Sequence, residues 1–188
     1  MSRYREIDLS RVKTYSAKTR PSKVHIAAEA VPFEPGLSFR EFVNRLPSIL
    51  KAEDIKHVAL DVVQARARRK PVIVMIGGHV IKTGCAPIIA DLVERGFVTL
   101  VASNGSAAIH DTELARFGHT SEDVAGQLTD GSFGMAEDTA ELVNRAADRA
   151  VQRDEGFGEA VGVELIAEKP PFLDRALLAL CYRAGIPY

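Results

Sequence analysis

Residues 71–84 read Pro-Val-Ile-Val-Met-Ile-Gly-Gly-His-Val-Ile-Lys-Thr-Gly, and this stretch decides the fold class. Its first six residues are apolar without alternation, which predicts a strand covered on both faces, as in a parallel sheet. Two glycines end the run, and a helix is expected over 86–95, with Pro87 in its first turn and Gly96 just past its end. The stretch therefore predicts a strand, a glycine-containing loop and a helix.

The chain repeats this order further on. Residues 98–102 form a second apolar run, the polar turn 103–106 follows, and another helix is expected from there. A strand, a helix and a second strand with short connections predict a βαβ unit. We therefore expect an α/β fold, a Rossmann-like three-layer sandwich with a mostly parallel sheet.

The flanking sequence carries weaker patterns. Residues 38–41 read Ser-Phe-Arg-Glu, a capping box that predicts the start of a helix. The other expected elements are an edge strand over 24–31, helices over about 52–69, 132–153 and 160–167, and a last helix ended by Gly185. We expect a basic N-terminal arm with an edge segment, 1–36, and an α/β domain, 37–188. Residues 186–188 stop where a further buried strand would follow, which indicates a domain truncated at its C-terminus.

Composition excludes several classes of protein. The 188 residues are 46% apolar, enough for one core, and 24 basic against 25 acidic residues leave a net charge of −1. That balance argues against a dedicated nucleic-acid binder. The sequence shows neither an apolar run of membrane-spanning length nor a secretory signal. Cys85 and Cys181 fit a reducing compartment, so a cytoplasmic protein is expected.

Polar residues follow both predicted strands. Loop 77–84 begins with two glycines, and segment 103–111 ends in the pair His110 and Asp111. Neighbouring parallel strands end at one edge, where α/β sheets bind ligands and a helix N-terminus attracts phosphate. The adjacent histidine and aspartate could act as acid and base. The alternatives are a plain glycine turn in the first loop and an Asp111 that only supports the first turn of a helix.

Other chemistries find less support. Of the five histidines, only His79 and His110 follow strands, which is too few ligands for a metal. Segment 129–134, Thr-Asp-Gly-Ser-Phe-Gly, is typical of a helix entry. Cys85 lies beside Gly84 without a histidine placed next to it, which favours an inert thiol.

Residues 74–111 resemble deoxyhypusine synthase and its relatives, through the glycine loop 77–84 and the segment 102–111. Segment 104–111 is also similar to the Asn-Ala-x-Ala-x-His-Asp segment of LOR/SDH-type ornithine cyclodeaminases. Segment 129–132 resembles a Thr-Asp-Gly-Ser segment of the synthases. These resemblances imply a Rossmann-like domain that binds NAD near the two strand ends.

The same resemblances imply roles for particular residues. The implied cofactor-binding residues are Gly77, Gly78, His79, Val80, Ser103, Asn104, Gly105 and Asp130. His79, His110 and Asp111 are the acid–base candidates for NAD-dependent oxidation of an amine or amino acid. The synthases need a lysine in a late Gly-Gly-Gly-Val-Val-Lys segment. The similar string that ends at Lys82 lies too early in the chain, so Lys82 is not assigned that role.

Two other functions stay open. One is a non-catalytic ligand-binding or assembly domain that lacks the lysine-bearing segment. The other is an enzyme acting on a phosphosugar or nucleotide sugar with a similar sheet. The expected partners are a small-molecule amine or amino acid and further copies of the chain, since a short sheet leaves an unpaired edge. Neither nucleic acid nor a membrane is expected as a partner.

Overall fold

The computed structural model describes residues 3–4 and 6–188. The chain divides into two compact units, residues 1–59 and 60–188. Among the described residues, no helix combines the length and the apolar character that crossing a bilayer requires.

The first unit contains the 3₁₀ helix η1 (Ile26–Ala28), helix α1 (Phe39–Arg45) and the start of helix α2 (Leu50–Ala67), which runs on into the second unit. The predicted capping box is confirmed at α1. The Ser38 hydroxyl accepts from the Glu41 amide at 3.3 Å, and the Glu41 carboxylate accepts from the Ser38 amide at 2.8 Å. None of the described residues of this unit is buried, so it has no core of its own.

The expected edge strand over 24–31 is wrong. Its centre is the 3₁₀ helix η1, and Ile26 is 84% exposed. The backbone of this segment pairs with the end of α1 and with the loop after it, not with a strand. The Val31 amide donates to the Arg45 carbonyl, and the Ser48 amide donates to the Ala28 carbonyl, both at 3.0 Å. An apolar run forms a strand only beside another strand, and the segment has none.

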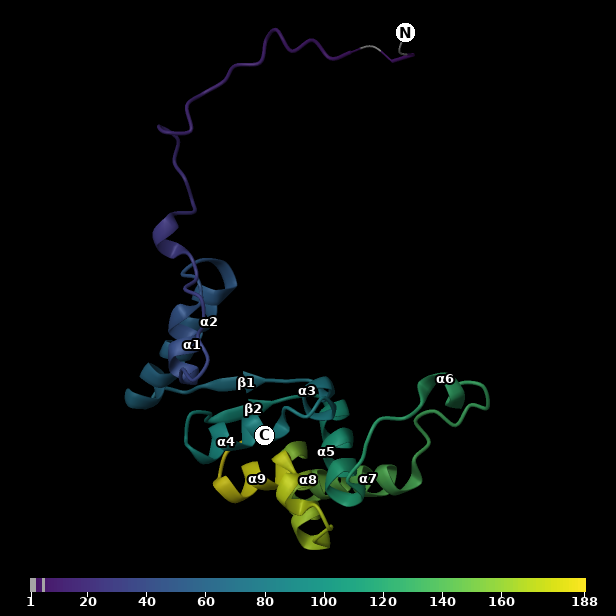
Figure 1. The fold of residues 1–188 in the computed structure, drawn as a ribbon. Helices are drawn as coiled ribbons and strands as arrows, with labels where there is room; N and C mark the ends of the chain where they lie inside the picture. Colours follow the sequence, from purple (N-terminus) through teal and green to yellow (C-terminus); the bar gives the residue numbers. More distant parts are fainter. Residues whose placement is uncertain (1–2, 5) are drawn as a thin grey trace. The chain divides into compact units, whose positions relative to one another are not determined.

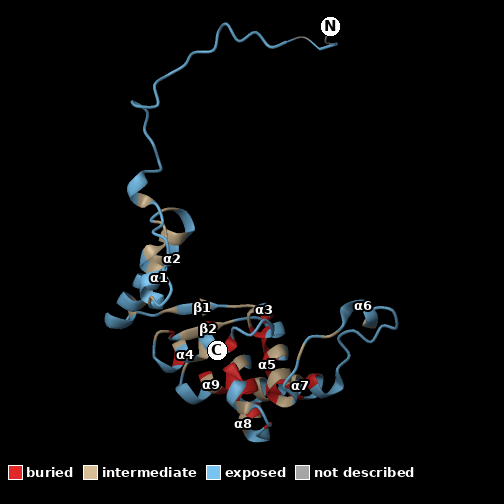
Figure 2. Ribbon diagram, viewed as in Figure 1, coloured by how far each residue is buried: buried red, intermediate tan, exposed pale blue. Residues whose placement is uncertain are grey.

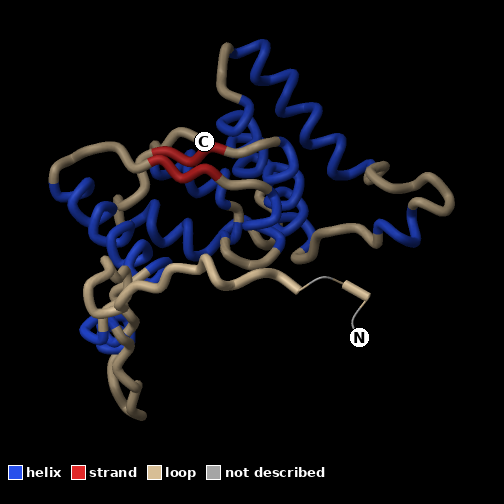
Figure 3. The backbone as a smooth tube through the Cα atoms, turned by 90° about the horizontal axis from the view of Figure 1, so that it is seen from above, coloured by secondary structure: helices blue, strands red, loops and turns tan. Residues whose placement is uncertain are grey.

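The second unit holds the two strands that the sequence predicted (Figures 1 and 3). Its elements after α2 are β1 (Ile73–Met75), α3 (Gly78–Lys82), α4 (Ala86–Glu94), β2 (Leu100–Ala102), α5 (Gly105–Phe117), α6 (Val124–Gln127), α7 (Glu137–Arg153), α8 (Phe157–Glu168), η2 (Leu173–Arg175) and α9 (Leu177–Ala184). The order strand, helices, strand, helix confirms the expected βαβ unit and the α/β fold class, in a form that is rich in helix.

The sheet is parallel and small. Strands β1 and β2 pair in the register Ile73 with Leu100 and Met75 with Ala102. On the other side of β2, the Val101 amide donates to the Pro187 carbonyl at 3.0 Å, so the last residues run beside this strand. The carboxyl ends of β1 and β2 therefore lie at the same edge.

The core lies between the sheet and the helices packed beneath it in Figure 1, and the buried residues concentrate on these helices in Figure 2. One cluster joins α5, α7, α8 and α9, and a second joins the strands to α4 and α9. The largest side chains that are fully buried include Ile81, Leu142, Leu165, Leu177 and Leu178. These clusters fix the start of α5 relative to the sheet.

Strand β1 is not covered on both faces as expected. Ile73 is 57% exposed and Met75 is 81% exposed, whereas Val74 packs against the core. A continuous apolar run shows that both faces tolerate burial. It does not supply the layer that would cover the second face, and within this unit no element covers it at these two positions.

One helix boundary differs from the expectation, and one short helix was not expected. The helix expected over 132–153 begins at Glu137, because residues up to Met135 form turns. A short helix that was not expected, α3, starts directly at Gly78. The expected terminator of the last helix is confirmed, since Gly185 caps α9 with φ +67°.

Candidate functional site

Two helices begin side by side at the carboxyl edge of the sheet. Gly77 follows β1 and is the N-cap of α3, and Asn104 follows β2 and is the N-cap of α5. The Ile76 amide donates to the Ala102 carbonyl at 2.9 Å, which holds the two loops together. The Asn104 side chain does not cap α5, and the Ala107 amide donates to the Asn104 carbonyl at 3.0 Å, so the Gly105 and Ser106 amides are the ones left open at the start of this helix.

Gly78 packs α3 directly against α5. Its amide donates to the Ser106 hydroxyl at 3.3 Å, and that hydroxyl donates to the Asn104 side-chain oxygen at 2.6 Å. A Cβ atom at position 78 would lie 2.7 Å from both the Ser106 hydroxyl and His110 Cδ2. The glycine is therefore required for this contact, which brings His110 to the strand edge.

The glycines on either side of this contact leave the edge open. A Cβ atom at Gly105 would meet nothing within 4 Å, and one at Gly77 would first meet the Asn104 side-chain nitrogen at 4.0 Å. His79 is exposed and Val80 is half-buried on the same short helix. Ser103, exposed, directly precedes Asn104. The structure thus brings together the cofactor-binding residues expected in the two loops.

A chain of hydrogen bonds leads from His110 into the protein. His110 Nδ1 lies 2.8 Å from the Thr120 hydroxyl. The Thr120 hydroxyl donates to one carboxylate oxygen of Glu113, and the Thr139 hydroxyl donates to the other at 3.0 Å. Hydrogen bonds therefore link the imidazole ring of His110 to residues of α5, of the loop after it and of α7.

The loop reaches His110 because α5 ends in a left-handed turn. Gly118 caps α5 with φ +75°, a conformation that glycine adopts without steric cost. The turn brings Thr120 back beside the helix that it has just left. Ser121 follows, and its hydroxyl lies 3.5 Å from the Lys82 ammonium of α3.

Charges of both signs surround His110. Partial burial lowers its pKa below the usual histidine value, and the Glu113 carboxylate opposes this shift. Lys82 and His79, both on α3, lower the pKa further. Burial and the two α3 groups favour a neutral imidazole, the form that can accept a proton.

Asp111 is not part of this arrangement. Its side chain is fully buried, and its two carboxylate oxygens accept from the Leu177 and Leu178 amides, each at 2.9 Å. These are the first two residues of α9, whose own N-cap, Ala176, has no side-chain cap. Asp111 thus caps another helix from within the core, and we assign it a structural role instead of the expected acid–base one. Burial raises its pKa to about 6.

Asp130 lies apart from the two strand ends. It is exposed in the loop between α6 and α7, which Figure 1 shows extending away from the sheet. Its carboxylate accepts from the Ser132 amide at 3.0 Å, and the Ser132 side chain and then this amide lower the pKa of Asp130. The carboxylate therefore stabilises a turn.

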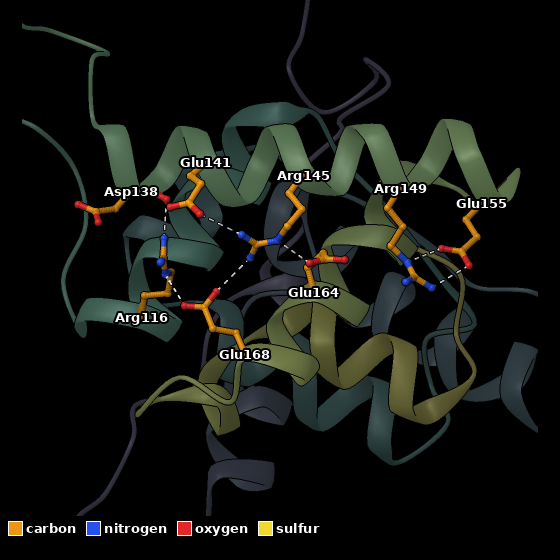
Figure 4. Close-up of polar contacts among 8 residues, drawn as sticks. All are labelled: Arg116, Asp138, Glu141, Arg145, Arg149, Glu155, Glu164 and Glu168. Atoms are coloured by element: carbon orange, nitrogen blue, oxygen red, sulfur yellow. Dashed lines mark hydrogen bonds and ion pairs between the residues drawn. The ribbon is translucent and has the colours of Figure 1, made fainter.

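An arginine network holds α7 where Thr139 can reach Glu113 (Figure 4). Arg116 of α5 donates to the Asp138 carbonyl and, at 2.8 Å, to the Glu168 carboxylate of α8. Arg145 of α7 lies 2.7 Å from the Glu164 carboxylate of α8. Three helices are tied together at the far end of the hydrogen-bond chain.

Sequence patterns did not single out Glu113 or Thr120 as candidate site residues. Glu113 follows His110 by three positions, a spacing that places both on one helix face and could have drawn attention to the pair. Thr120 carried no such signal, because it reaches His110 only through the turn at Gly118.

Carboxylates also line the space next to this chain. Two cavities, of about 240 and 270 Å³, share Glu113, Glu122, Ala136 and Thr139 in their walls. Both Glu122 oxygens accept from the Gly134 amide at 3.1 Å. Acidic walls favour a ligand that carries positive charge.

Fold and site together define a Rossmann-fold α/β domain with an open edge at the ends of two parallel strands. The family model described as arginine dihydrolase ArgZ-like, C-terminal, Rossmann fold matches residues 56–153, just over half of the chain. The chain belongs to this family.

Individual relatives are more distant. An ornithine cyclodeaminase of Methanothermobacter thermautotrophicus is 22% identical over 134 residues, which are 71% of this chain and 29% of that protein. This chain thus spans less than a third of the relative's length. The relative and the family support the ornithine cyclodeaminase side of the expected resemblance, whereas a relationship to deoxyhypusine synthase is not shown.

Two solved structures are similar to the chain. The apo structure of ArgZ, an arginine dihydrolase from the ornithine–ammonia cycle in cyanobacteria, is 21% identical and covers 74% of this chain and 18% of its own, with a TM-score of 0.48. A conserved putative LOR/SDH protein from Methanococcus maripaludis S2 is 20% identical. The match covers 89% of this chain and 46% of that protein's chain, with a TM-score of 0.49.

Proposed function

We propose that this domain binds the dinucleotide NAD or NADP at the strand edge and serves the oxidation of an amine or amino acid. The observation that carries the proposal is the start of α5. A helix of 13 residues begins beside the end of a parallel strand, with no side-chain cap on its first amides. Free amides in this position bind phosphate groups in α/β folds.

The residues at the edge fit such a group. Gly77 and Gly105 present open backbone, so a pyrophosphate could approach the amides closely. The Asn104 side-chain nitrogen lies 4.0 Å from the Cβ position of Gly77 and offers a polar partner. Because a relative that is 22% identical over 134 residues is named ornithine cyclodeaminase, an amino acid is the substrate class that we propose.

The acidic cavity walls at the Glu113 end of the hydrogen-bond chain support a cationic substrate. Glu113 and Glu122 line both neighbouring cavities, and an ammonium group would complement them. A bound nicotinamide would supply acceptance of a hydride from the carbon that carries the amine. The part of this chain would be to hold the dinucleotide at the edge and to take up a proton at His110.

We also propose the setting in which the domain works. Cys85 and Cys181 are both free thiols, which fits a reducing cytoplasm. Ile73 and Met75 leave apolar surface exposed on the sheet, which favours association with further copies of the chain.

The test is calorimetric titration of the whole chain with NAD, NADP and ADP-ribose. Gly77→Val places a branched side chain at the edge, where the structure has room for it but a ligand would not. Gly156→Val is the matched control, because Gly156 is also an N-cap glycine with extended backbone and open space around its Cβ position, at the start of α8.

We expect dinucleotide binding that Gly77→Val weakens at least about tenfold, or about 1.4 kcal/mol, and that Gly156→Val leaves unchanged. Equal affinity in all three chains, or none in the unaltered chain, would contradict the proposed site. Binding without turnover of ornithine or polyamines would favour the non-catalytic ligand-binding alternative.

A further inference from the structure

The direction of the hydrogen bonds around Glu113 fixes where the proton sits on His110. A carboxylate only accepts hydrogen bonds, and Glu113 accepts one on each oxygen, from Thr139 and from Thr120. The Thr120 hydroxyl has a single proton, which it donates to Glu113. Its oxygen can therefore only accept from His110, so the neutral imidazole carries its proton on Nδ1.

The other ring nitrogen, Nε2, is then the one that accepts. Among the described residues, no group hydrogen-bonds this atom, and it is not a buried unpartnered atom. The neighbouring ring carbon, Cδ2, lies against Gly78 at the strand edge. The lone pair of Nε2 is thus available beside the open ends of β1 and β2.

We propose that Glu113 and Thr120 are positioning residues that hold His110 in the Nδ1–H form, with Nε2 as the base for a protonated amine substrate; this rests on the function proposed above. In that step an N–H bond of the substrate ammonium breaks. The proton passes to Nε2, and the electron pair stays on the substrate nitrogen. Only the neutral amine can then release a hydride from its carbon.

The groups that face His110 agree with this role. On α3, the positive charge of Lys82 and the neighbouring His79 disfavour an imidazolium, while the negative charge of Glu113 on α5 favours one. Thr120, from the loop after α5, adds a neutral hydrogen bond. Partial burial of the ring has the largest effect, and together with the two α3 groups it outweighs Glu113. The pKa of His110 therefore lies below the usual histidine value, which favours the neutral ring.

The test is nitrogen NMR of the whole ¹⁵N-labelled chain, with the two ring nitrogens of His110 followed through a pH titration. We expect the neutral form to show a protonated Nδ1 and an unprotonated Nε2. Thr120→Val removes the acceptor, so the proton should redistribute toward Nε2. Ser121→Ala is the matched control, because it removes the adjacent hydroxyl, which bonds Lys82 and not His110. Glu113→Gln should lower the pKa of His110 further, because it removes the charge that opposes the shift.

A neutral His110 with its proton on Nε2, or a proton position that Thr120→Val does not change, would overturn the proposal. The measurement needs no dinucleotide, so it separates this inference from the proposed function. If the protein shows the Nδ1–H form but binds no dinucleotide, the inference about His110 stands and the proposed function is contradicted. Where turnover is measured, the acidic limb of the pH profile of kcat/KM should shift to lower pH in Glu113→Gln, together with the pKa of His110.

Discussion

Single side chains decide how the two loops of the site are held. Gly78 lets α3 touch α5, and Gly118 turns the chain so that Thr120 returns to His110. Asp111 lies one residue after His110, yet its side chain points into the core instead of toward the strand edge. Neighbouring helix positions point in directions about 100° apart, so one residue can serve the site and the next the core.

Asp111 makes the stability of the protein depend on pH. Burial raises its folded-state pKa to about 6 from 3.8, so between these values the folded state binds more protons than the unfolded state. The contribution of this group is therefore greatest below the unfolded pKa and is lost as the pH rises through about 6. Relative to Asp111→Asn, the unaltered chain should lose about 2 kcal/mol of unfolding free energy between about pH 4 and pH 7.

Urea unfolding of both chains at several pH values in this range measures the difference directly. Asp130→Asn is the control, because the pKa of this exposed aspartate is lowered in the folded state. Its contribution to stability therefore changes with pH in the opposite direction, and the change occurs below about pH 4. A difference between the unaltered chain and Asp111→Asn that does not vary with pH would show that Asp111 ionises normally.

At the scale of elements, ion pairs join α7 to α8. Arg145 lies 2.7 Å from Glu164, 3.3 Å from Glu141 and 3.4 Å from Glu168 (Figure 4). Glu168 also binds Arg116 of α5, so the pairs form a network across three helices. Isolated surface pairs contribute little to stability, whereas a network that shares partly buried carboxylates contributes more.

We expect Arg145→Met to destabilise the chain by about 1 kcal/mol, because it leaves Glu164, which is 16% exposed, without its closest cation. Thermal unfolding at low and at high salt measures this, and high salt should narrow the difference. Arg95→Met is the control: its partner Asp91 is half exposed and on the same helix, so the change should stay within about 0.5 kcal/mol. Equal effects of both variants would mean that the network adds nothing beyond single pairs.

At the scale of the whole molecule, stability is divided unevenly between the two units. The buried residues all belong to the second unit, and the described part of the first unit has none. Protection of backbone amides follows buried packing, because opening a region without a core exposes little apolar surface.

Hydrogen exchange followed by mass spectrometry should therefore separate the units. We expect peptides from residues 6–59 to exchange within seconds to minutes, and those from α5, α8 and α9 to exchange by orders of magnitude more slowly. The part of α2 within residues 60–67 serves as an internal reference, since it belongs to the second unit but is mostly exposed. Strong protection in residues 6–59 would show that this unit is covered in solution.

Much of the element order could be read from the chain. The strands at 73–75 and 100–102 and the helices α4 and α5 were predicted, because apolar runs, glycine turns and helix caps are signals within a few residues; the short helix α3 was not. The same signals located the open edge at Gly77 and Asn104. They could not show that Ile73 and Met75 face outward, because exposure depends on what packs against the strand.

The sequence alone determined the α/β order and the two loops at the strand edge, since both depend on local backbone preferences. Only the tertiary structure decided the roles within the site. Asp111 caps a helix that begins 66 residues later, and Thr139 reaches Glu113 across 26 residues. Such contacts depend on how the helices pack, and the local sequence does not indicate which distant side chain a residue will contact. His110 is therefore visible in the sequence as a candidate, while the position of its proton is a property of the fold.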